Sequence, residues 1–184
     1  YSIAGLSTTV DNIYVQGGTY NIPDSLIMNK PVNLYGGFNG LSEAETPETR
    51  TLSDLDHNGK IESWEFTNAS VLNSTFKNPN STLANSAFVF STATMTSPLI
   101  FDGFTITHTV STTNGAQRTF NCLSSISVIQ NVSFKNSNIN TLQYSSISNR
   151  ATLLSALGIV RNCLFEKNTI YVRNSRYDKY VMPI

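Results

Sequence analysis

Three copies of one motif lie along this chain: VLNSTFKN at residues 71–78, IQNVSFKN at 129–136 and VRNCLFEKN at 160–168. A fourth segment, FDGFTITHT at 101–109, has the same form with a glycine in place of the asparagine. The shared motif is an apolar residue, any residue, Asn or Gly, any two residues, then Phe or Ile. A motif that recurs along a chain indicates a structural unit that recurs in space.

The copies keep the same phase although their spacing varies. The Asn or Gly positions are 30, 28 and 31 residues apart, and an apolar residue follows each of them after three residues. The two sets are Asn73, Gly103, Asn131 and Asn162, and Phe76, Ile106, Phe134 and Phe165. Strands in stacked coils must stay in register while the loops between them can lengthen, so this pattern predicts a stack of parallel β coils.

Shorter strand-like segments fill the spaces between the copies. They alternate apolar and polar residues, or they are short apolar runs that end at turn residues, as strands do. The segments are IYVQGGTY (13–20), VNLYGG (32–37), SAFVFS (86–91), RTFNCLSS (118–125) and TLLSALGIV (152–160). The two Gly-Gly pairs, Gly17–Gly18 and Gly36–Gly37, lie 19 residues apart. We expect no long helix, and a sandwich would not repeat one motif in one phase.

This ladder resembles the right-handed parallel β-helix, a solenoid. The segments IYVQGGTY and VNLYGGFNG resemble bacterial secreted proteins of that fold, which include pectate-lyase-like and polymorphic outer-membrane-protein-like chains. The resemblance implies an all-β fold in one domain, residues 1–184, whose coils each turn through three sheets. It also implies that the asparagines stack at a bend and that the rings stack inward, each burial contributing roughly 1.5–3 kcal/mol.

The segment DLDHNGKIESWE, residues 54–65, concentrates the chemistry of the chain. It matches the twelve-residue calcium-loop pattern at every required position, including a glycine at position six for the sharp turn. The predicted Ca²⁺ ligands are the side chains of Asp54, Asp56, Asn58 and Glu65 and the main-chain carbonyl of Lys60. Glu62 is expected to act through water, and Ile61 is expected to be an apolar anchor.

These twelve residues resemble the loop of an EF-hand, but their flanks do not. Pro47 restricts any helix before the loop, and FTNASVLNSTF after Glu65 is strand-like. We therefore expect a structural calcium loop within an inserted excursion, residues 40–68, and not a paired calcium sensor. The alternative is an acidic, solvated turn that matches the pattern by chance.

Composition excludes several classes of partner. The 184 residues are 40% hydrophobic, enough for one domain with a core, but only 13% charged with zero net charge. This balance argues against binding nucleic acid or an anionic membrane surface. No run of eighteen apolar residues predicts a transmembrane segment. The abundance of Ser, Thr and Asn favours an extracellular or bacterial cell-surface location, and the start at Tyr1 indicates a processed or partial chain.

The two cysteines, Cys122 and Cys163, allow one disulfide or two free thiols. The place of Cys163 in the ladder favours a buried thiol. The terminal segment IYVRNSRYDKYVMPI, residues 170–184, gathers tyrosines and basic residues. This cluster suits a cap on the solenoid or an incomplete coil, and alternatively a sugar-binding surface.

We expect adhesion or glycan binding, with a glycan or another surface protein as partner. The alternatives are a polysaccharide lyase or glycoside hydrolase, which the resemblance allows, and a purely structural surface stalk. Catalysis is disfavoured because acids outside the calcium loop and the segment 43–48 are sparse, and no two of them match in adjacent coils. Asp102, beside Gly103, is expected to cap a turn, and His108 has no evident partner. No catalytic residue is predicted.

Overall fold

The computed structural model describes residues 12–28, 32–42, 44–77, 85–90, 99–114, 117–123, 126–143, 151–174 and 180–183. Strands and turns make up these residues, and no helix occurs among them. None of the described segments forms a helix with the length and apolar character that a membrane crossing requires.

The strands form three sheets. The first sheet holds β1 (Asn12–Gln16), β4 (Asn33–Phe38), β7 (Ile100–Asp102), β10 (Val128–Gln130) and β14 (Ile159–Arg161). The second holds β2 (Gly18–Ile22), β5 (Ser70–Ser74), β8 (Phe104–Asn114), β11 (Ser133–Lys135), β15 (Leu164–Glu166), β12 (Asn138–Gln143), β16 (Thr169–Asn174) and β17 (Tyr180–Pro183). The third holds β3 (Leu26–Met28), β6 (Asn85–Phe90), β9 (Gln117–Cys122) and β13 (Ala151–Ala156).

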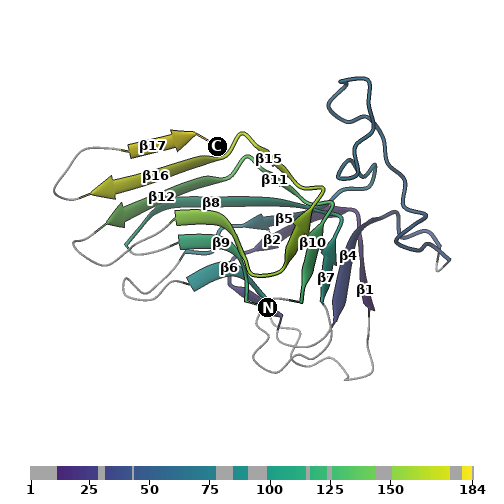
Figure 1. Ribbon diagram of the computed structural model, residues 1–184, viewed down its shortest axis with the longest axis horizontal. Coiled ribbons are helices and arrows are strands. Elements are labelled where there is room, and N and C mark those ends of the chain that lie inside the picture. The colour runs from purple at the N-terminus through teal and green to yellow at the C-terminus, as the bar shows by residue number, and fades with distance from the viewer. Residues whose placement is uncertain are drawn as a thin grey trace.

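The chain visits these sheets in the same order on each pass. It runs from β1 to β2 to β3, then from β4 to β5 to β6, and the order continues in β7, β8 and β9. Strands in the same place of successive passes pair in parallel, and β17 alone among the named strands pairs antiparallel, along β16. Figure 1 shows the first-sheet strands crossing the direction of the second-sheet strands. The predicted all-β, parallel architecture is confirmed.

Three members of the predicted apolar column are stacked. Phe134 pairs with Ile106 on one side and with Phe165 on the other. The rings of Phe134 and Phe165 are parallel within 3°, with centroids 4.9 Å apart. Phe134 is fully buried, but Phe165 is 39% exposed because β15 is the last strand at that side of the sheet.

The prediction that Phe76 is the fourth member of this column is wrong. The register places Leu72 beside Ile106 and Asn73 beside Thr107, so Leu72 occupies the column. Strand β5 ends at Ser74, and Phe76 lies beyond that end, buried in the same core cluster but outside the column. The motif at 71–78 therefore lies four residues out of phase with its structural counterparts.

Asn73 consequently lies inside a strand and not at a bend. Its amide donates to Asn21 Oδ1 at 2.8 Å and accepts from the Thr107 hydroxyl at 2.8 Å. This is a polar ladder across β2, β5 and β8, separate from the predicted asparagine column.

The other three positions of the asparagine column do form the bend between the first and second sheets. Gly103, Asn131 and Asn162 have φ values of 80°, 55° and 51°. Asparagine and glycine tolerate this left-handed conformation better than other residues do. Asn162 Nδ2 donates to Asn131 Oδ1 at 3.3 Å, so the predicted amide stacking is confirmed for this pair.

The core lies between the sheets. It is dominated by rings and branched aliphatic side chains, in agreement with the inward positions of the alternating strands. Its fully buried members include Phe88, Phe101, Phe104, Phe120, Phe134, Ile106 and Ile129. Neither cysteine forms a disulfide; Cys122 is buried and Cys163 is half-buried against the core, where burial raises the pKa of Cys163.

The excursion connects β4 to β5 and projects from the sheets (Figure 1). Its base is held by Gly17 N, which donates to Phe38 O, and by Gly18 N, which donates to Ala69 O. Further out, an isolated antiparallel bridge joins Leu52 to Phe66. The calcium pattern therefore lies in the part of the excursion that this bridge closes.

Candidate metal centre

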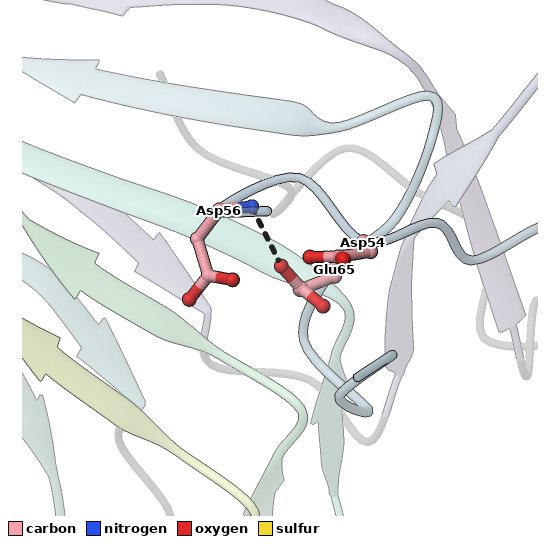
Figure 2. A group of neighbouring side chains, drawn as sticks. All are labelled: Asp54, Asp56 and Glu65. Carbon is pink, nitrogen blue, oxygen red and sulfur yellow. Dashed lines mark hydrogen bonds between the residues drawn. The ribbon is translucent and has the colours of Figure 1, made fainter. Parts of the chain in front are cut away.

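Three acidic side chains converge in the excursion. Asp54, Asp56 and Glu65 each place a carboxylate oxygen within 4.8 Å of the other two. Figure 2 shows the Asp54 and Glu65 carboxylates side by side, with the Asp56 amide pointing at Glu65. The three residues come from both ends of the twelve-residue segment, so the loop folds back on itself. This acidic triad can hold a metal ion.

Asp54 organises the turn of the loop. Its Oδ1 accepts from Asn58 N at 3.0 Å, and its Oδ2 accepts from Gly59 N at 2.9 Å. Gly59 has a φ of 86°, a conformation that favours glycine at this position. The sharp turn that the sequence predicts at Gly59 is therefore present.

Glu65 is the buried member of the triad. Its Oε1 accepts from the main-chain amides of Leu55 and Asp56 at 2.9 and 3.2 Å, and its Oε2 accepts from Glu62 N at 2.9 Å. The residue is 4% exposed. These amide donors, Glu62 N first among them, lower the pKa of the Glu65 carboxyl because they stabilise its charged form.

Glu62 lies against Glu65 and carries the opposite shift. Its pKa is raised chiefly because the Glu65 carboxylate beside it favours a protonated partner. Within the described part of the chain, its Oε2 is also a buried oxygen that receives no hydrogen bond. The carboxyl groups of Glu62 and Glu65 are thus in contact, and one oxygen of Glu62 has no hydrogen-bond donor. A cation would stabilise this arrangement.

Asn58 and Lys60 occupy the middle of the loop. The Asn58 amide nitrogen donates to Asp56 Oδ2 at 3.1 Å and to Glu62 Oε1 at 3.2 Å, while its oxygen accepts from Lys60 N at 2.9 Å. The amide must therefore turn over before its oxygen can bind an ion. The role of the Lys60 carbonyl stays a prediction. Ile61 is 62% exposed, so the predicted apolar anchor is wrong.

A buried ion pair that the sequence did not reveal fastens the excursion to the first sheet. Arg50 Nη2 lies 3.1 Å from Asp102 Oδ2, and both side chains are 4% exposed. The guanidinium also donates to Gly36 O at 2.7 Å and lies 4.5 Å from the centroid of the Phe66 ring. Arg50 and Asp102 are far apart in sequence, so no local pattern could have paired them.

Asp102 does more than cap a turn. Its second oxygen accepts from Asn131 Nδ2 at 2.9 Å, and Oδ2 also accepts from Gln130 Nε2 at 2.8 Å. The carboxylate therefore links the asparagine column to Arg50. Its contacts are those of a structural ion pair.

His108 has partners that the sequence did not predict. Its Nδ1 is 2.8 Å from the Thr119 hydroxyl, and its Nε2 is 2.9 Å from Phe76 O. A carbonyl only accepts, so Nε2 carries the proton and Nδ1 accepts from Thr119. Burial lowers the pKa of His108 to about 4, which keeps the ring neutral. These contacts are those of a satisfied core histidine.

Part of the C-terminal aromatic and basic cluster lies outside the described residues. Strand β17 covers the edge of β16, as a cap on an open sheet edge would.

Comparison with known proteins identifies no relative: no family model, no curated protein and no solved structure matches the chain.

Proposed function

We propose that this chain is a calcium-stabilised parallel β-helix of the bacterial cell exterior. The observation that carries the proposal is the convergence of Asp54, Asp56 and Glu65 on a twelve-residue calcium pattern. In this proposal Asn58, after its amide turns over, and the Lys60 carbonyl complete the ligand set.

The role of the ion is to order the excursion. Calcium prefers six to eight oxygen ligands in flexible geometry, which carboxylates and carbonyls of a single loop can supply. Binding offsets the repulsion between the carboxylates, and a cation also stabilises the contact between Glu62 and Glu65. The bridge between Leu52 and Phe66 lies next to both ends of the loop, so an ion bound in the loop fastens the outer part of the excursion.

The repeated passes through three sheets support the β-helix interpretation, and the right-handed sense belongs to the proposal. The biological role that we propose is adhesion or glycan binding, with a glycan or another surface protein as partner. Scarce charge and abundant Ser, Thr and Asn support a location outside the cell. The His108 and Asp102 contacts, which are structural, favour binding over catalysis.

The test compares thermal unfolding in excess calcium with unfolding in a chelator. We expect calcium to raise the melting temperature, because an ion that binds only the folded state contributes about 2.7 kcal/mol at a hundredfold excess over Kd. Asp54→Ala combined with Glu65→Ala should abolish the rise and the heat of calcium binding in calorimetry.

The matched control is Asp24→Ala combined with Glu48→Ala, which removes two exposed carboxylates elsewhere. This variant should keep the full calcium response. Identical melting curves of the unaltered protein in calcium and in chelator would refute the calcium site.

A further inference from the structure

We propose that a cavity between the first sheet and the start of the excursion binds a neutral pyranose sugar. The cavity has a volume of about 300 Å³ and is lined by Tyr14, Gln16, Phe38, Gly40, Leu41, Ser42 and Glu45. Its size falls at the lower end of the range for small-molecule sites, which suits a single sugar ring. The inference deepens the glycan-binding part of the proposed function and does not depend on the calcium site.

One wall of the cavity is aromatic. Tyr14 is 52% exposed, yet its ring is held by neighbours, with centroids 4.9 Å from Phe38 and 5.8 Å from Tyr35. A supported ring with an open surface offers large contact area at low cost in conformational entropy. The apolar face of a pyranose, formed by its C–H groups, can pack on such a ring.

The lining also carries fixed hydrogen-bonding groups. Gln16 Nε2 donates to Asn39 O at 2.9 Å, which orients the amide and leaves Oε1 as an acceptor. Both oxygens of Glu45 accept from Asn39 N, at 3.0 and 3.2 Å. Each carboxylate oxygen has a further lone pair, so Glu45 can also accept from sugar hydroxyls. Because both side chains are already held, little ordering is needed when a sugar binds.

The charge of the cavity selects among sugars. Among the lining residues that the structure describes, Glu45 is the charged one. Arg50 lies near Phe38, 5.6 Å from its ring centroid, but its charge is compensated by Asp102. The cavity is therefore negative, and a uronate or a phosphorylated sugar would be repelled. Hydroxyls of a neutral sugar instead gain charge-assisted hydrogen bonds to Glu45.

A second cavity continues the site. It has a volume of about 280 Å³ and shares Gln16 and Phe38 with the first. Its remaining lining is polar side chains and main chain at the base of the excursion, including Asn39, Thr67 and Asn68. Amide and hydroxyl groups of this kind suit a second sugar unit, so a disaccharide should bind more tightly than a monosaccharide.

The experiment measures sugar binding to the full chain in calcium, by saturation-transfer NMR and calorimetry. The probes are the methyl glycosides of glucose, galactose and mannose, their disaccharides, and glucuronate. We expect at least one neutral glycoside to bind and glucuronate not to bind. Tyr14→Ala should weaken binding at least tenfold, while Tyr14→Phe, which keeps the ring, should bind as the unaltered protein does.

A second pair of variants tests the carboxylate. Glu45→Gln keeps an oxygen for Asn39 N but loses the charge, so affinity should fall several-fold. Glu48→Gln, an exposed neighbour outside the cavity, should leave affinity unchanged. Circular dichroism and melting temperature confirm that each variant is folded.

Two results would overturn the sugar site: undiminished binding by folded Tyr14→Ala, or no binding of any neutral sugar. If the second result occurs while calcium still raises the melting temperature, the sugar site fails and the calcium proposal stands. If a neutral sugar binds but calcium does not raise the melting temperature, the sugar site stands and the calcium proposal fails.

Discussion

The imidazole of His108 is a buried group whose protonation state should affect stability. Its folded pKa of about 4 lies below the ordinary value of 6.5 because burial disfavours the charged ring. The Thr119 hydroxyl and the Phe76 carbonyl that contact it do not titrate in this range. As pH falls below 6.5, the unfolded chain binds a proton that the folded chain does not, so stability is lost between pH 6.5 and 4.

The predicted loss from this residue is about 3 kcal/mol, since one pKa unit corresponds to about 1.4 kcal/mol. Urea unfolding of the unaltered protein and of His108→Gln, measured from pH 7 to pH 4, tests this prediction. The variant should lose less stability over that range. The same pH slope in both proteins would contradict it.

At the scale of the elements, the bends between strands depend on residues in the left-handed conformation. A second bend, between β11 and β12 and between β15 and β16, places Asn136 at φ 55° and Lys167 at φ 53°. The register of β11 and β15 makes these two positions equivalent. Lysine has no side-chain oxygen to compensate the strain of this conformation, whereas asparagine does.

We therefore expect Lys167→Asn to stabilise the protein by about 1 kcal/mol. The lost ion pair with Glu166 matters little, because the two side chains are 73% and 37% exposed. A rise in melting temperature of about 2–4 °C is expected for a chain of this size. The opposite substitution at the equivalent position, Asn136→Lys, should lower the melting temperature. A fall with Lys167→Asn would show that the bend is not strained.

At the scale of the whole molecule, the excursion is attached to the sheets but does not form them. The residues on either side of it, Phe38 and Ala69, accept hydrogen bonds from the successive residues Gly17 and Gly18, so the two ends of the excursion lie close together. Strands β4 and β5 belong to the sheets on either side of this point. The parallel sheets should therefore form without the excursion.

The corresponding experiment replaces residues 40–68 with two glycines. Asp102→Asn is included, because removing Arg50 would otherwise leave a buried, unpaired charge at a cost of about 3–5 kcal/mol. We expect a folded protein with an unchanged β-type circular dichroism spectrum, no calcium response and no sugar binding. Loss of the folded state would mean that the excursion is part of the folding unit.

The sequence by itself determined the all-β class, the parallel repetition, the bend positions at Gly103, Asn131 and Asn162, and the turn at Gly59. These features follow from local backbone preferences and from periodicity, which act over a few residues or over one repeat. The calcium pattern is likewise a local feature, confined to one loop.

Only the tertiary structure decided the contacts that the motif did not predict. It put Leu72 in the column where the motif had placed Phe76, joined Arg50 to Asp102, and formed a cavity beside Tyr14 and Glu45. The physical reason is that the excursion shifts the phase of the motif while strand pairing and core packing set the register. Contacts between residues distant in the chain leave no mark in a local pattern.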